Sequence, residues 1–169
     1  MTQATSAYPE PANPYAKFLG DRDAKEVIAQ TPVRLTELAR KLGKDGLEKS
    51  LAPGKWSVRE ILCHLADCEV VFAFRLRQAL AEDNAVIQPF DQNHWAKPYA
   101  RLTAQDALDA FSTLRRWNLA LIATLSPADL ARTTTHPERG PMTMQTIVET
   151  MGGHDTNHLV QVETIAANN

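Results

Sequence analysis

The stretch SVREILCHLADCEVVFAFRLRQALAE, residues 57–82, decides the fold class of this chain. It opens with a capping-box pattern, in which the Ser57 hydroxyl accepts from an amide of the first turn and Glu60 reaches back to the Ser57 amide. Apolar residues then recur at helical spacing, at Val58, Leu62, Leu65, Phe72, Leu76 and Leu80. The stretch therefore predicts an amphipathic helix over residues 57–82.

Three other stretches show this apolar period, at residues 22–42, 103–125 and 143–166. We expect an interruption of the first at Thr31-Pro32, because proline there allows a restart but no unbroken hydrogen-bond ladder. No β alternation and no internal repeat is evident in the sequence. Four helices of about twenty residues predict an all-α four-helix bundle.

The connections and the start of the chain carry most of the prolines. Two connections, residues 84–102 and 126–142, are long and predict a topology other than simple up-down-up-down. Proline-rich sequence before the first helix predicts an irregular N-terminal arm over residues 1–20. A single bundle domain over residues 21–169 is expected to follow it.

The composition is typical of a globular domain that needs no covalent or metal support. With 44% hydrophobic residues among 169, the chain can bury a core without disulfides or a structural metal. Its 18 basic and 20 acidic residues leave a net charge of -2, which gives no global attraction to nucleic acid or anionic lipid. We therefore expect neither nucleic acid nor a membrane as a partner.

The cysteines and the N-terminal sequence both bear on the compartment. Cys63 and Cys68 lie five apart on one predicted helix, where their Cα separation exceeds the ~7 Å limit for a disulfide. We interpret them as reduced core thiols, which are typical of a cytosolic protein. No signal-peptide pattern and no stretch long enough to span a bilayer is present. The sequence thus predicts a cytoplasmic protein.

Three of the five histidines fall on the predicted inward faces of helices. His154 and His158 are one helical turn apart, so both imidazoles lie on one face, where they can share a metal. His64 falls just inside the apolar arc of the 57–82 helix. Three neutral imidazoles suit Zn²⁺, Ni²⁺ or Fe²⁺ and leave a coordination position open. On spacing alone, core histidines satisfied by hydrogen bonds explain the pair equally well.

Residues beside the His154/His158 pair also bear on whether these histidines bind a metal or are core histidines satisfied by hydrogen bonds. Gly152-Gly153 fit a close approach by a neighbouring backbone or ligand, although plain helix weakness explains them nearly as well. Asp155 and Gln161 are candidates for orienting an imidazole by hydrogen bonding. For Asp155, a buried link to the backbone of another helix fits the pattern equally well.

The run FDQNHW, residues 90–95, is the other dense group of functional side chains. Over a metal pocket, Asp91 or His94 could serve as acid, base or extra ligand, with Trp95 as a wall. A loop anchored on the bundle surface by Phe90 and Trp95 explains the run somewhat better, residue by residue. Asp91 and His94 are therefore only weak catalytic candidates.

Other catalytic patterns are absent from the sequence. There is no Gly-rich phosphate loop, no G-x-S-x-G elbow and no set of Glu-x-x-His motifs for a di-iron site. We interpret the basic pairs Arg75/Arg77 and Arg115-Arg116 as solvated faces, and His136 as a surface residue.

The sequence resembles the DinB-like (DinB/YfiT) superfamily of small metal-binding four-helix bundles. The matching segments are PGKWSVREILCHLADCE (53–69), FDQNHW (90–95) and GGHDTNHLVQVETI (152–165). The resemblance implies a metal held by His64, His154 and His158, the histidines that the helical spacing also selects. For members with known activity it implies thiol-dependent transfer or isomerisation with a low-molecular-weight thiol, or metal-dependent hydrolysis. It also implies a homodimer.

Two functional hypotheses follow. The first is a metal-dependent enzyme, either a thiol-dependent transferase or a hydrolase, which uses one divalent metal ion on a small-molecule substrate. The alternative is a non-catalytic stress-response or interaction bundle, whose histidines are structural or bind metal incidentally. A pocket filled by side chains would favour the alternative.

Overall fold

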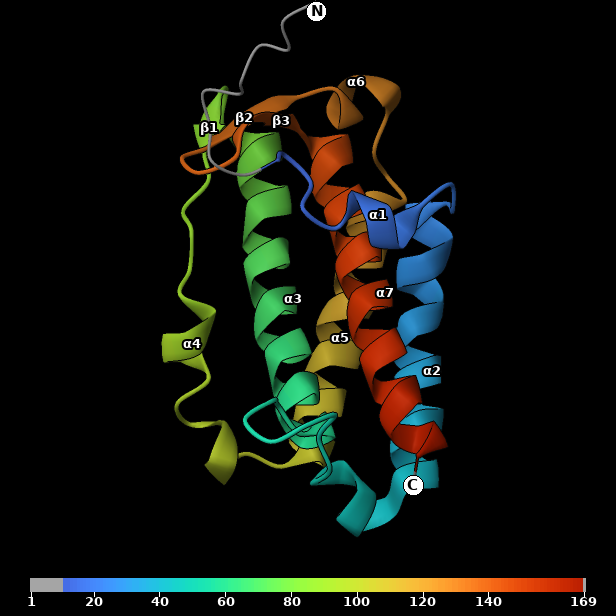
Figure 1. Ribbon diagram of the computed structural model, residues 1–169. Coiled ribbons are helices and arrows are strands. Elements are labelled where there is room, and N and C mark those ends of the chain that lie inside the picture. The colour runs from blue at the N-terminus through green and yellow to red at the C-terminus, as the bar shows by residue number, and fades with distance from the viewer. Residues whose placement is uncertain (1–10, 169) are drawn as a thin grey trace, which may run out of the picture.

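The computed structural model of the chain describes residues 11–168. Four long helices form a bundle (Figure 1), which confirms the predicted fold class. Shorter helices lie at its ends and along one side: α1 (Ala16–Leu19), α4 (Gln92–Trp95), the 3-10 helix η1 (Tyr99–Arg101) and α6 (Pro127–Leu130). The bundle helices are α2 (Ala24–Leu47), α3 (Val58–Ala81), α5 (Ala104–Ile122) and α7 (Met144–Ala167).

The helix starts follow from local side-chain chemistry. Glu60 N donates to the Ser57 hydroxyl, and Glu60 Oε2 accepts from Ser57 N at 2.8 Å, which is the predicted capping box. Thr103 caps α5 in the same sense, by accepting from the amide of Asp106 at 3.1 Å. These caps determine the residue at which α3 and α5 each begin. They therefore also determine how far along the bundle each side chain of these helices lies.

Helix α2 departs from the prediction at Pro32. The expected interruption there is wrong, because the helix continues through Pro32, and the hydroxyl of Thr31 donates to Val27 O at 2.9 Å. Gly43 then leaves helical geometry with a φ of +62°, a region that favours glycine, and one further turn follows to Leu47. The carbonyl that Pro32 leaves without a helical partner, Ile28 O, takes a different donor, described below.

The four bundle helices do not alternate strictly in direction. This confirms the prediction drawn from the two long connections. In Figure 1, α2 and α7 both run downward, whereas α3 and α5 both run upward. The segment between α3 and α5 returns along the side of the bundle, and carries α4 and η1. Helix α7 packs against both α2 and α3, and α5 packs against the same two helices from the other side. Side chains of α3 and α7 therefore meet in the interior.

A small sheet closes the upper end of the bundle, which corrects the expectation of a chain without strands. It consists of β1 (Ala85–Val86), β2 (Thr133–His136) and β3 (Gly140–Thr143), in the order β1-β2-β3. β1 pairs parallel with β2, and β2 pairs antiparallel with β3. Strands of two to four residues are too short for a sequence period to reveal, and their pairing depends on the helices that bring them together.

Two apolar clusters fill the bundle, and a layer of buried polar side chains separates them. The upper cluster includes Ile28, Leu76, Ile122 and Met151, and the lower cluster includes Leu35, Leu62, Phe111 and Val162. Seven residues between these positions on α3, α5 and α7 are polar and at least 95% buried. We call them the polar layer: His64, Glu69, Arg115, Asn118, His154, Asp155 and His158.

The N-terminal segment packs against the bundle. The predicted arm, residues 1–20, is described only from residue 11 onward, and there it includes α1, which packs against α7. Within residues 11–168, no helix combines the length and the apolar character needed to cross a membrane.

Candidate metal centre

The three histidines selected from the sequence meet in the polar layer. His64 comes from α3, and His154 and His158 come from successive turns of α7. His64 Nε2 lies 3.1 Å from His154 Nε2, and one ring nitrogen of each histidine lies within 4.8 Å of those of the other two. Antiparallel packing of α3 and α7 is what brings residues ninety positions apart to one point. The arrangement is that of ligands that converge on a single ion.

Burial keeps these imidazoles neutral. It lowers the pKa of His64 to about 3, with a further contribution from His158. It lowers the pKa of His158 to about 4, against the opposing effect of Gln161. The pKa of His154 falls well below its usual value, chiefly through burial and then through the charges of the other two histidines. Neutral imidazole is the form that binds a metal.

Hydrogen bonding also distinguishes this cluster from an ordinary group of core histidines. Nδ1 of His154 is buried and has no hydrogen-bond partner among the described residues. Its Nε2 faces the imidazole of His64, a group with no fixed charge. A buried imidazole satisfied within the core would have a partner at each nitrogen. The residues present therefore fit a divalent cation bound among the three rings.

Aromatic rings wall the histidines on two sides. The ring of Tyr15 stands edge-on to His154, with centroids 5.0 Å apart, and Trp56 lies 4.7 Å from His64. Gly153 explains how Tyr15 comes so close, because a Cβ at residue 153 would collide with the Tyr15 main-chain oxygen. A Cβ at residue 152 would similarly lie 3.1 Å from Leu19 Cδ1. The close-approach interpretation of the glycine pair is confirmed.

The neighbours of the pair on α7 differ in what they contact. Gln161 Oε1 lies 3.1 Å from His158 Nδ1, where it can accept the ring proton and hold the orientation of the imidazole. Among residues 11–168, the Asp155 carboxylate is hydrogen-bonded to neither a histidine nor a backbone group. It instead accepts from both terminal nitrogens of Arg115, at 2.5 and 3.1 Å.

Arg115 corrects one of the sequence interpretations. It is 1% exposed rather than solvated, and it also donates to Glu69 Oε2 at 2.8 Å. Asn118 completes this network by donating to Glu69 Oε1 at 2.8 Å. The two buried carboxylates explain why the guanidinium of Arg115 is retained inside the bundle. Without it, Glu69 and Asp155 would both be unpaired buried charges. Arg116, the next residue, is exposed as predicted.

Cys68 lies beside the histidines, although the sequence suggested only a core thiol. Its Sγ is 3.4 Å from His64 Nε2 and 3.8 Å from His154 Nε2. Both cysteines are free, and burial is the main cause that raises the pKa of Cys68 above its usual value. The i, i+4 spacing of His64 and Cys68 is the signal that could have identified this contact.

Two surface cavities reach the histidines from different sides. One, of about 460 Å³, includes His64, Cys68 and His154 in its lining, together with residues of β2 and of the segment before α4. The other, of about 510 Å³, includes His64 and His158. Tyr15 and Gln92 line both cavities, and so lie where the two adjoin. A small molecule in the first cavity would face the ring of His154.

Of residues 90–95, only the first half lines the first of these two cavities, the one that also reaches His154. Asp91 and Gln92 line the first cavity, whereas His94 is exposed and Trp95 packs on Phe90 with centroids 5.1 Å apart. Asp91 Oδ2 lies 2.6 Å from His94 Nδ1, and its Oδ1 accepts from the amide of His94 at 3.1 Å. The backbone and then the side chain of His94 lower the pKa of Asp91. Asp91 is therefore a carboxylate on the wall of the cavity.

Two other residues of the first cavity were misplaced by the sequence interpretation. His136 is only 2% exposed, because it lies on strand β2 and not in a turn on the surface. Arg75 is 9% exposed, and its Nη2 donates to Gln88 O at 3.0 Å. Burial, followed by the charge of Arg139, lowers the pKa of Arg75 to about 10. His136 belongs to the sheet and Arg75 contacts the 84–91 segment, and neither placement was predictable from helical spacing.

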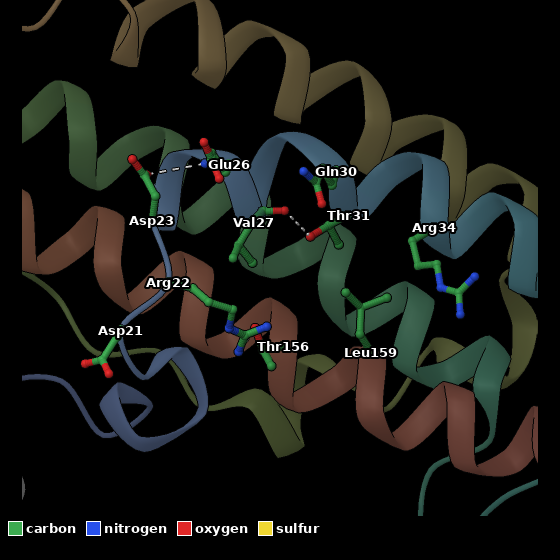
Figure 2. Close-up of a pocket in the computed structure, with 10 residues that line it drawn as sticks. All are labelled: Asp21, Arg22, Asp23, Glu26, Val27, Gln30, Thr31, Arg34, Thr156 and Leu159. Atoms are coloured by element: carbon green, nitrogen blue, oxygen red, sulfur yellow. Dashed lines mark hydrogen bonds between the residues drawn. The ribbon is translucent and has the colours of Figure 1, made fainter.

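A separate groove of about 550 Å³ lies between α2 and α7, and Figure 2 shows the residues that line it. Arg22 crosses it to donate to Thr156 Oγ1 at 3.1 Å. Its described lining contains no histidine or cysteine. The groove therefore lies apart from the candidate metal centre.

Comparison with known proteins agrees with this geometry. Residues 28–162 match the sequence model of the DinB superfamily. The chain belongs to the DinB superfamily. The match spans all three histidines and most of both apolar clusters of the bundle.

Curated relatives of this DinB superfamily chain carry a common name. One from Oceanobacillus iheyensis is 31% identical over 139 residues, which are 82% of this chain and 81% of the relative. One from Bacillus mycoides is 26% identical over 82% of this chain and 80% of the relative. Both are named "Putative metal-dependent hydrolase".

A solved structure shares the DinB superfamily fold. YfiT from Bacillus subtilis superposes with a TM-score of 0.80 at 20% identity, over 99% of this chain and 91% of that chain. It is described as a probable metal-dependent hydrolase with an unusual four-helix bundle topology. At this identity the likeness bears on the fold, including the non-alternating helix directions.

Proposed function

We propose that this protein is a metal-dependent hydrolase of small molecules, in which His64, His154 and His158 hold one divalent metal ion. The observation that carries the proposal is the convergence of three buried, neutral imidazoles within 4.8 Å at the inner ends of two cavities. The names of the relatives support the reaction class. Zn²⁺, Ni²⁺ and Fe²⁺ all suit imidazole ligands.

The residues around the centre have distinct tasks in this proposal. Gln161 accepts the proton of His158 Nδ1, which leaves the other ring nitrogen free to bind. Tyr15 and Trp56 hold the rings of His154 and His64 and restrict the access of water to the cavities. A divalent ion held there supplies a Lewis acid that activates a water or a thiol at neutral pH.

Asp91 is the proposed proton acceptor. Its carboxylate lies on the wall of the cavity that reaches His64 and His154, and its lowered pKa keeps it ionised at neutral pH. An ionised carboxylate accepts a proton from an attacking water but has none to give to a leaving group. The proposal therefore assigns Asp91 the role of base.

Two other functions remain as alternatives to test. A thiol-dependent transferase would use the same histidines, with a low-molecular-weight thiol in place of water. A non-catalytic bundle would need no access to the histidines. The cavities of about 460 and 510 Å³ favour a protein that admits a small molecule over a closed structural site.

The first test is metal content. The purified protein should hold about one divalent ion per chain by mass spectrometry of the metals, His154→Ala should lose it, and His94→Ala should keep it. The His94 variant is the matched control, because that histidine is exposed outside the cluster. Absence of stoichiometric metal, or its retention by His154→Ala, would overturn the proposal.

The second test is activity on a defined panel. Small esters and amides should be hydrolysed by the metal-loaded protein, and Asp91→Asn should lower kcat more than it raises KM. Turnover that appears only when a low-molecular-weight thiol and an electrophile are supplied would favour the transferase. Saturable metal binding without turnover of either class would favour the non-catalytic bundle.

A further inference from the structure

Arg75 on α3 is a buried guanidinium on the wall of the first cavity. It is 9% exposed, and the cavity it lines also reaches His64 and His154. Its Nη2 donates to Gln88 O at 3.0 Å, whereas its Nε is buried and has no hydrogen-bond partner among residues 11–168. Within the same part of the chain, no carboxylate oxygen lies within 4 Å of it. The described protein thus supplies no counter-charge for this cation.

Arg115 shows how this bundle treats a buried guanidinium whose counter-charge the chain itself provides. It pairs with Asp155 at 2.5 Å and with Glu69 at 2.8 Å. Burial opposes the charged form of Arg115, but the two carboxylates raise its pKa above the usual value. For Arg75, burial and then the charge of Arg139 lower the pKa to about 10, so the side chain is still a cation at neutral pH. A buried cation without a partner is costly, and an anion that enters the cavity removes that cost.

A second arginine lies on the same cavity wall. Arg139 is in the turn between β2 and β3 and is half-buried. Burial is the main cause that lowers the pKa of Arg75 and of His154, and the charge of Arg139 contributes to both. Arg139 is therefore close enough to act on the guanidinium of Arg75 and on the candidate metal centre. The anion would meet two cations on its way to the histidines.

The charges of the lining favour a singly charged ligand. The lining contains two arginines, Arg75 and Arg139, and two acidic residues, Asp91 and Glu138. Because these formal charges cancel, a carboxylate suits the wall better than a phosphate dianion. The planar guanidinium also matches the two oxygens of a carboxylate.

The position of Arg75 relates the anion to the histidines. Arg75 follows His64 by eleven residues on α3, which is about 16 Å along the helix axis. Side chains on a helix lean toward its N-terminus, so the guanidinium extends back toward His64. Its charge acts on the thiol of Cys68, one turn beyond His64, and opposes the rise in pKa that burial causes there. A molecule held at Arg75 therefore reaches the histidines with a part several bonds away from its anionic group.

We propose that the first cavity binds its substrate through a carboxylate, which pairs with Arg75 and Arg139, and directs an ester or amide of the same molecule toward His154. The inference rests on the proposed hydrolase and names its substrate class: small carboxylic acids with an ester or amide several bonds from the carboxylate. Hydrolysis of such an ester consumes one water and breaks the bond between the acyl carbon and the alkoxy oxygen. It yields an alcohol, a second carboxylate and one proton, which leaves to solvent.

The competing explanation is a structural arginine that only holds residues 84–91 against α3 through Gln88 O. Arg132 is the matched control, because it also joins two segments through a main-chain oxygen. Its Nε donates to Ala79 O at 2.8 Å, and it lies outside the described lining of the first cavity. A structural role predicts similar effects of Arg75→Gln and Arg132→Gln on stability, and none of either on the binding of a carboxylate.

Calorimetric titration with glutarate, a dicarboxylate without a scissile bond, tests the site apart from activity. The wild type should bind glutarate saturably both with its metal and after chelation, and inorganic phosphate should bind more weakly. Arg75→Gln should weaken glutarate binding at least about tenfold, Arg75→Lys should weaken it less, and Arg132→Gln should leave it unchanged. Arg139→Gln should also weaken it, and this variant keeps the test available if Arg75→Gln does not fold.

Three results of this titration would overturn the carboxylate site. They are the absence of saturable glutarate binding by the wild type, its disappearance on chelation, and unchanged affinity in folded Arg75→Gln or Arg139→Gln. Tighter binding of phosphate than of glutarate would overturn the assignment to carboxylates.

A pair of esters separates this inference from the proposed function. The metal-loaded wild type should hydrolyse monoethyl glutarate with a kcat/KM at least about tenfold above that for the neutral diethyl glutarate, and Arg75→Gln should remove this preference mainly through KM. Equal hydrolysis of both esters by the wild type would overturn the substrate class and leave the hydrolase. Glutarate binding that depends on Arg75, without hydrolysis of any ester or amide, would overturn the hydrolase and support the carboxylate site.

Discussion

Arg115 on α5 donates through Nη1 to the main-chain oxygen of Ile28 on α2, at 2.8 Å. This carbonyl has no helical partner, because residue 32 is a proline without an N–H. The same guanidinium donates to Asp155 on α7 and to Glu69 on α3. A single buried side chain therefore links all four helices at the height of the candidate metal centre.

Replacement of Arg115 should be among the most damaging single changes in the bundle. Arg115→Met keeps an unbranched, largely apolar side chain but leaves Asp155 and Glu69 buried without a cation. Breaking a buried ion pair in this way costs about 3–5 kcal/mol of unfolding free energy. Urea denaturation should show the loss as a lower midpoint.

The neighbouring residue is the control for this prediction. Arg116 is exposed, so Arg116→Met should change the unfolding free energy by no more than about 0.5 kcal/mol. Equal effects of the two substitutions would mean that the buried network contributes nothing specific.

Stability of the metal-free protein should fall between pH 7 and pH 5. The pKa of His64 is lowered to about 3 and that of His158 to about 4, whereas an unfolded histidine titrates near 6.5. The unfolded chain therefore binds more protons as the pH drops below about 6.5, which destabilises the fold. Each of these histidines should cost about 2 kcal/mol at pH 5.

Denaturant midpoints at both pH values, measured with chelator present, check this prediction. His64→Gln should reduce the loss between pH 7 and pH 5 by about 2 kcal/mol, because glutamine does not titrate. A pH dependence that the substitution leaves unchanged would show that His64 can be protonated in the folded protein.

The two glycines of α7 should respond differently to alanine. In Gly153→Ala the new Cβ would collide with the main-chain oxygen of Tyr15, a backbone atom that cannot move aside alone. Overpacking costs about 1–3 kcal/mol, and alanine returns at most about 1 kcal/mol of helix propensity. In Gly152→Ala the Cβ meets Leu19 Cδ1 at 3.1 Å and Ala24 Cα and Cβ at 3.2 Å, so these neighbours need to shift by only a few tenths of an ångström.

Thermal unfolding of both variants measures the difference. Gly153→Ala should be destabilised, whereas Gly152→Ala should stay within about 1 kcal/mol of the wild type. Stabilisation of both variants would mean that the glycines mark helix weakness and not a close approach of the chain.

Metal removal should abolish activity before it unfolds the protein. The two apolar clusters lie above and below the polar layer and are built from apolar side chains, so they do not need a bound ion to form. Treatment with a strong chelator should therefore remove the metal and the hydrolytic activity while the far-ultraviolet circular dichroism retains its helical signal. Loss of that signal on chelation would show that the ion supports the fold.

Much of the bundle was predictable from local patterns. The capping box at Ser57 and the apolar period after it determine α3. The spacing of His154 and His158, and the place of His64 in the apolar arc of α3, select the three histidines. The homodimer and the cytoplasmic location, expected from the resemblance and the composition, stay predictions.

Other features escaped prediction because their partners are distant in sequence. A helical wheel shows that Arg115 and Asp155 each lie on a helix face but not that the two faces meet. The sheet escaped because its strands have two to four residues. His136 and Arg75 are buried by segments that only the fold places over them.

The sequence by itself determined the helices, their inward faces and the three histidines, because each depends on spacings within a few turns of one segment. Only the tertiary structure decided that α3 and α7 run antiparallel in contact, which places His154 beside His64 and Cys68. It also decided that Arg115 joins the four helices through Ile28, Glu69 and Asp155. The physical reason is that buried polar groups must be satisfied by partners from other helices, and local sequence does not specify which partners these are.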